Sequence, residues 1–79
     1  MDYLSELRLL CQKFESRTYS IDDFSQTLAY FPSPEIWGSL VTDAEDAVER
    51  VRFLISEERQ YEEVVKIIKS LLLEVTQFD

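Results

Sequence analysis

The chain has 79 residues, which is enough for one hydrophobic core but not for two. Sixteen acidic residues against eight Lys and Arg give a formal net charge of −8, which argues against binding to nucleic-acid phosphates or to an anionic membrane surface. The chain has no His and a single Cys, so a His-based catalytic centre, a Cys-rich zinc site and an internal disulfide are excluded.

Other features of the sequence indicate the cellular compartment in which the protein is expected. No apolar run approaches the roughly 20 residues that cross a bilayer, and residues 1–6 lack the basic and then apolar pattern of a signal peptide. The unpaired Cys11 suits a reducing environment and is expected in the core. We therefore expect a cytoplasmic protein with one domain over residues 1–79.

Apolar residues recur at intervals of three and four, which predicts helices. The first helix is predicted over about residues 2–15. The second is predicted from residue 21 to about residue 31, because the Ser20 hydroxyl can cap the free amides at its start and prolines follow its end.

The third helix is predicted to be long, from residue 34 to about residue 56. Ser33 is a suitable cap and Pro34 a suitable first residue. Two features complicate this prediction: Gly38 lies inside the segment, and residues 42–45 form a capping-box sequence that could mark a kink or a new start at Thr42.

The fourth helix is predicted to begin between residues 57 and 62, where no Gly or Pro separates it from the third. Four amphipathic helices with short links predict an all-α fold, an antiparallel four-helix bundle whose long third helix is either straight or kinked. The residues predicted for its core are Leu7, Phe14, Phe24, Leu28, Trp37, Leu40, Val48, Val51, Ile68 and Leu72.

The negative charge is concentrated in residues 35–63, which hold nine of the sixteen acids and three of the eight bases. Glu45 and Glu49 share a helical face, as do Asp46 and Glu49, and like charges at these spacings destabilise a helix slightly. Such a face is expected of a surface that binds cations. It is equally expected of a solvated face that keeps the protein soluble.

The sequence offers little to support catalysis. Its carboxylates are predicted on exposed helical faces, and a single Gly does not suffice for a phosphate-binding loop. A calcium loop needs its Gly among oxygen ligands, but Gly38 lies in the sequence WGSL. Ser39 does not match the attachment site of an acyl carrier protein, because no Asp precedes it at a helix start. We expect no enzymatic activity, metal or cofactor.

Aromatic residues supply two further candidates. Trp37 is expected in the core, with partial exposure as an interface anchor the alternative. Tyr61 lies between Glu58 and Glu62, where its ring could receive a Lys or Arg from a partner. Tyr19, Tyr30 and Phe78 flank helix ends, where their rings are expected to be buried.

Several segments together resemble a family of bacterial immunity proteins, the colicin D immunity protein family. They are a Leu-rich first helix ending in the turn FESRTYS, a second helix beginning IDDFS, the helix start SPEI, and the acidic stretch DAEDAVER. An acidic connection and a closing amphipathic helix follow. The likeness covers most of the chain as an order of helices and a few residues, and the chain is shorter in its last connection and lacks the family's run of Asp there.

The resemblance implies a four-helix immunity protein that blocks the active site of a basic nuclease toxin, an RNase or tRNase, with acids in place of nucleic-acid phosphates. The partner would be the toxin's catalytic domain, which we expect a monomer to bind, with a homodimer as the alternative. The toxin-binding residues carried over by position, with Tyr61 added from its own surroundings, are Asp46, Glu49, Glu57, Glu58, Tyr61, Glu62 and Glu63. The alternative is a helical adaptor that dimerises through its third and fourth helices, for which a continuous helix through residues 56–62 would be evidence.

Overall fold

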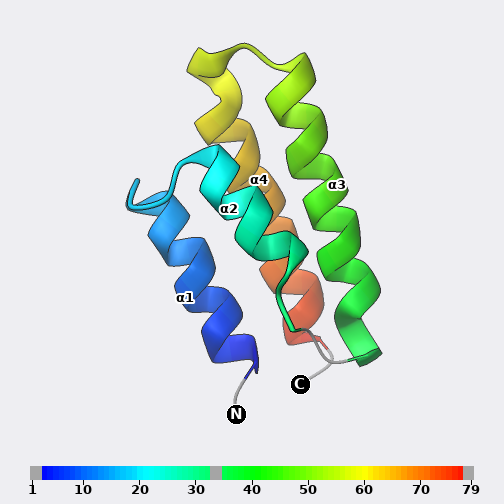
Figure 1. Ribbon diagram of the computed structural model, residues 1–79. Coiled ribbons are helices and arrows are strands. Elements are labelled where there is room, and N and C mark those ends of the chain that lie inside the picture. The colour runs from blue at the N-terminus through cyan, green and yellow to red at the C-terminus, as the bar shows by residue number, and fades with distance from the viewer. Residues whose placement is uncertain (1–2, 33–34, 78–79) are drawn as a thin grey trace.

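The computed structural model describes residues 3–32 and 35–77, which are all-α. The helices are α1 (Tyr3–Glu15), α2 (Ile21–Ala29), α3 (Gly38–Leu54) and α4 (Glu57–Thr76), and a short 3₁₀ helix, η1 (Glu35–Trp37), precedes α3. Successive α-helices run in opposite directions, and α3 lies beside both α2 and α4 (Figure 1). None of the helices described is long and apolar enough to cross a membrane.

The first helix ends in a left-handed turn. Arg17 has a φ of 65°, the N–H of Thr18 donates to the carbonyl of Lys13 at 2.8 Å, and the N–H of Arg17 donates to the carbonyl of Phe14 at 2.9 Å. These two bonds form a Schellman motif, in which the left-handed position is usually a Gly. The helix therefore stops close to the predicted residue 15.

The second helix begins as predicted. Ser20 is its N-cap, and the Ser20 hydroxyl accepts a hydrogen bond of 3.1 Å from the N–H of Asp23. It ends at Ala29, two residues earlier than predicted, and Tyr30 is its C-cap. Phe31 then leaves the helix and its ring stacks on Trp37, with 6.3 Å between centroids.

The prediction of one long third helix from residue 34 is wrong. Glu35–Trp37 is a 3₁₀ helix, and the α-helix begins at Gly38 and ends at Leu54. Trp37 leaves the α-helical region, with a φ of −131° and a ψ of 18°, and its indole is buried. The helix does not restart at Thr42, whose hydroxyl donates to the Gly38 carbonyl within the helix. The proposed start residues Ser33 and Pro34 lie outside the described residues.

The third and fourth helices are separate. Ile55 is extended and Ser56 is the N-cap of α4, so α4 begins at the early end of the predicted interval. The side-chain amide of Gln60 donates to the carbonyls of Arg52 and Ile55, at 3.3 and 3.0 Å. It thereby satisfies carbonyls that the end of α3 leaves free.

One cluster of apolar side chains forms the core, with contributions from α1, α2, Trp37, α3 and α4. The predicted core residues are buried, except that Leu40 and Leu72 are only half-buried, while Val41 and Leu71 beside them are buried. A one-residue step turns a side chain by about 100° on a helix, which is enough to move it from the core to its edge. Cys11 is buried as predicted, and burial raises the pKa of its thiol to about 12.

Candidate functional site

A furrow with a volume of about 390 Å³ lies between α2 and α3. Its lining residues recur at intervals of three or four along each helix, apart from the adjacent Ser25 and Gln26, so they form one stripe per helix. The stripe on α2 consists of Asp22, Ser25, Gln26 and Ala29, with Tyr30 at the end of the helix. The stripe on α3 consists of Glu45, Glu49 and Arg52.

A second hollow, of about 290 Å³, adjoins the furrow where α3 turns into α4. We call it the corner hollow. It shares Asp22 and Arg52 with the furrow, so the two form one depressed surface. Its lining residues are Ile21, Asp22, Arg52, Phe53, Glu57 and Gln60.

A polar network fixes the floor of this surface. The hydroxyl of Ser25 donates to Oε1 of Glu49 at 2.5 Å. Nη1 of Arg52 donates to both carboxylate oxygens of Glu49, at 2.9 and 3.2 Å, and Nη2 of Arg52 lies 2.7 Å from Oδ1 of Asp22. Arg52 therefore ties α2 to α3 through two carboxylates. Ser25 is buried, and this bond satisfies its hydroxyl.

The network also determines the ionisation of Glu49. The hydrogen bond from Ser25 is the largest effect and lowers the pKa of Glu49. Desolvation opposes it, and the guanidinium of Arg52 adds to it. Glu49 is thus held as a carboxylate, and its charge is already matched within the protein.

The acids predicted to bind a partner divide into two groups. Glu49 is paired as described, and Glu63 lies 3.4 Å from Arg59 and 3.6 Å from Lys66 on its own helix. The exposed acids Asp46, Glu57, Glu58 and Glu62 have no hydrogen bond or ion pair to another side chain in the described part of the chain.

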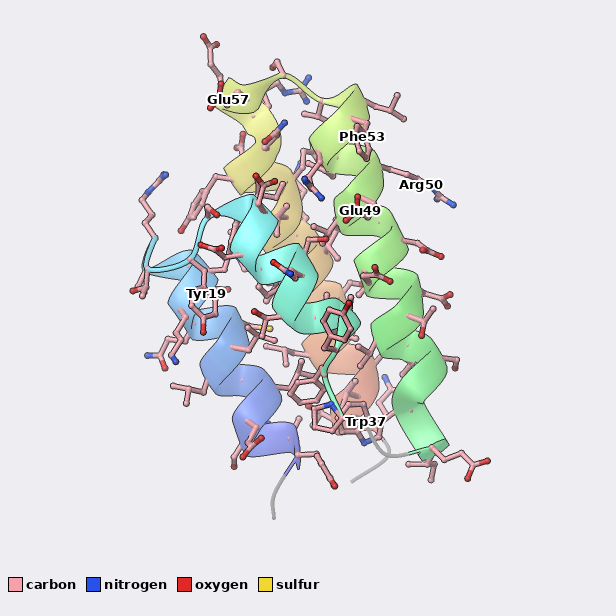
Figure 2. The ribbon with its side chains drawn as sticks, in the orientation of Figure 1. Tyr19, Trp37, Glu49, Arg50, Phe53 and Glu57 are labelled. Carbon is pink, nitrogen blue, oxygen red and sulfur yellow. The ribbon has the colours of Figure 1, made fainter. Side chains whose placement is uncertain are left out.

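The structure brings only some of these acids together. Glu49 and Glu57 line the joined surface, whereas Asp46, Glu58, Glu62 and Glu63 do not. Arg50, which follows Glu49 in α3, points away from α2 (Figure 2).

Tyr61 does not offer a free ring to a partner. Its hydroxyl donates to the carbonyl of Glu15 at 2.5 Å, and its ring stacks on Phe14 with 5.4 Å between centroids. The guanidinium of Arg17 lies 3.9 Å from the ring centroid, so the cation predicted from a partner is supplied by the chain itself.

Trp37 is buried in the core, as expected, so the alternative of a partly exposed interface anchor is wrong. Its side chain is 3% exposed, and Figure 2 shows it at the end of the helices where α3 begins. The expectation that the ring of Tyr30 is buried is wrong, because this residue is 81% exposed. Tyr19 is half-buried with Lys13 5.4 Å from its ring centroid, and Phe78 lies outside the described residues.

Sequence reasoning missed two kinds of residue at this surface. Asp22 was not among the candidates, because nothing in the sequence shows that α3 lies beside the start of α2. Phe53 was not considered, although its position gives a signal. It falls off the apolar stripe formed by Val41, Ala44, Val48 and Val51, and a large aromatic residue off the stripe is exposed.

Nothing in residues 3–32 and 35–77 forms a cluster of three or more His, Cys, Asp or Glu that could hold a metal ion. No protein-family model, curated protein or solved structure matches the chain significantly. The functional interpretation therefore rests on the surface itself and on the properties of the sequence.

Proposed function

We propose that this protein is an immunity protein, an antitoxin that binds the catalytic domain of a basic nuclease toxin and blocks its active site. The nuclease would be an RNase or tRNase, and the two proteins would meet in the cytoplasm of the cell that makes the toxin. The helices would act as a rigid antiparallel four-helix bundle. The resemblance to the colicin D immunity protein family in the order of segments supports this choice.

The observation that carries the proposal is the set of unpaired acids at the middle of α3 and in the first two turns of α4. Asp46, Glu57, Glu58 and Glu62 are exposed and lack partners among the described residues, in a chain with a net charge of −8. A nuclease keeps Lys and Arg at its active site to hold phosphates. Acids on rigid helices can pair with those cations, which accelerates association and fixes the orientation of the complex.

The adaptor that dimerises through one long helix is less well supported. It was expected to have a continuous helix through residues 56–62, but Ile55 is extended and α4 begins at Glu57. A second copy would also bring the same net charge of −8 to the interface, and like charges oppose association.

The proposal is tested by a pull-down with tagged protein from the cells that carry its gene, followed by mass spectrometry. The test variant changes Asp46, Glu57, Glu58 and Glu62 to Lys. The matched control changes four other exposed acids, Glu6, Glu15, Glu35 and Glu74, to Lys, so both variants change the net charge equally. Circular dichroism checks that both remain helical.

The proposal expects the parent protein and the control to recover one basic nuclease domain and the test variant to lose it. Purified parent protein should then inhibit RNA cleavage by that domain, and inhibition should weaken as the salt concentration rises. Recovery of only a second copy of the chain, or a partner that both variants lose equally, would contradict the proposal.

A further inference from the structure

Phe53 is an exposed aromatic residue at the last turn of α3. Its side chain is 76% exposed, and it borders the corner hollow together with Glu57 (Figure 2). Isolated exposed apolar residues are common on protein surfaces and carry no meaning by themselves. Phe53 is distinguished by what surrounds it, because a hollow with acidic residues lies directly beside the ring.

The residues around Phe53 are held firmly. The guanidinium of Arg52 lies 5.6 Å from the Phe53 ring centroid, and it is fixed by its bonds to Asp22 and Glu49. On the other side, the Gln60 amide ties the end of α3 to α4. A partner that binds here has little chain to order, so binding costs less conformational entropy.

The charge of the corner hollow suits a cation. Its charged residues are Asp22, Arg52 and Glu57. Arg52 is already paired with two carboxylates, whereas Glu57 is exposed and has no ion pair in the described part of the chain. A Lys or Arg side chain entering the hollow would therefore meet an unmatched carboxylate.

We propose that Phe53 is the apolar anchor of the partner interface and that a Lys or Arg of the partner enters the corner hollow beside it. The inference rests on the proposed function, since it identifies where the basic toxin domain binds. Aromatic residues are enriched at the centres of interfaces, where they fill pockets of the partner and are ringed by polar contacts. Phe53 thus takes the role that the buried Trp37 does not have.

The kind of partner follows from the charges. Nucleic acid and anionic membranes are repelled by a surface of this sign. A second copy of the chain would place its own excess of acids against Glu57. A basic protein surface with an apolar socket next to a Lys or Arg is complementary to both the ring and the hollow.

The test is photo-crosslinking in the full chain, inside the cells that carry its gene. Phe53 is replaced by p-benzoylphenylalanine in one variant and Leu73 in the other. Leu73 is a matched control because it is 67% exposed but lies near the opposite end of α4 and lines neither the furrow nor the corner hollow. Cross-linked products are identified by mass spectrometry, and the affinity of the purified domain is then measured for Phe53→Ala and Leu73→Ala.

The inference expects a cross-link to a basic nuclease domain from position 53 and none from position 73. Phe53→Ala should raise Kd at least tenfold, and Leu73→Ala should change it less than twofold. Both side chains are exposed, so both variants should fold, as circular dichroism would verify. Glu57→Gln should raise Kd by a smaller factor, several-fold.

The other outcomes separate the two proposals. If the pull-down recovers the basic domain but position 53 gives no cross-link to it, or Phe53→Ala binds it as tightly as the parent, then Phe53 is not the anchor and the proposed function stands. If position 53 cross-links to a second copy of the chain, the anchor proposal is overturned in favour of a dimer. If neither the pull-down nor the cross-linking yields a basic domain, both proposals fail.

Discussion

The left-handed turn after α1 allows a quantitative test. Arg17 has a φ of 65°, and its guanidinium lies 3.9 Å from the centroid of the Tyr61 ring. The left-handed region costs a residue with a Cβ about 1–2 kcal/mol relative to Gly, and Gly loses about 0.4–1 kcal/mol more backbone entropy on folding. Taking the middle of each range, Arg17→Gly should be more stable than Arg17→Ala by about 0.8 kcal/mol.

Comparing these two variants isolates the backbone, because both remove the cation–π contact. That contact contributes about 0.5–1 kcal/mol at an exposed site. Arg17→Ala should accordingly be less stable than the parent by this amount, and Arg17→Gly should be close to the parent. For a domain of this size, the difference between the two variants corresponds to about 3–6 °C in Tm.

Urea denaturation followed by circular dichroism measures the order of stability. The matched control is the neighbouring residue, since Thr18 does not have a positive φ. There Thr18→Gly should be less stable than Thr18→Ala by about 0.5–1 kcal/mol. If Arg17→Ala were as stable as Arg17→Gly, the left-handed conformation would not be the one that residue 17 adopts in solution, and the reasoning would be refuted.

Three further predictions concern the core, the polar network and the thiol. Trp37→Ala should destabilise the protein by about 3–5 kcal/mol in urea denaturation, because the side chain is buried; a loss below about 1 kcal/mol would show that it is not. The pKa of Glu49 is lower in the folded state than its ordinary value of 4.5. Its carboxylate therefore stabilises the folded protein above pH 4.5, and this contribution is lost as the pH falls through the pKa that Glu49 has in the folded state. The stability difference between the parent and Glu49→Gln should therefore shrink below pH 4.5, and a constant difference from pH 7 to pH 2.5 would contradict this. Cys11 should react with Ellman's reagent at pH 8 only when urea unfolds the protein, because its thiol is buried and its pKa is raised to about 12; rapid labelling of the native protein would be the opposing result.

Local sequence signals were sufficient wherever a short-range interaction decides the structure. The spacing of apolar residues predicted four helices, and Ser20 predicted the start of α2 through a cap that the structure contains. The same periodicity placed Leu7, Phe24 and Val48 in the core, where they are fully buried.

Predictions were wrong, or gave only a range of residues, where distant residues decide. The α3 start depends on Trp37, which turns into the core and stacks on Phe31. The turn between α3 and α4 contains neither Gly nor Pro, and the Gln60 amide compensates for the carbonyls that it leaves free. Neither contact can be read from a window of neighbouring residues.

The candidate site also combines features that the sequence alone determines with features that depend on distant residues. The sequence by itself determined that the chain is acidic, which follows from its composition, and helical, which follows from the spacing of its apolar residues. Only the tertiary structure decided which acids remain free. Where α2 packs against α3, Glu49 and Asp22 hold Arg52. The turn after α1 places Arg17 over the ring of Tyr61 on α4, and Phe53 is left exposed beside Glu57. Pairing between charges and rings depends on distances across helices, and these distances exist only once the helices have packed.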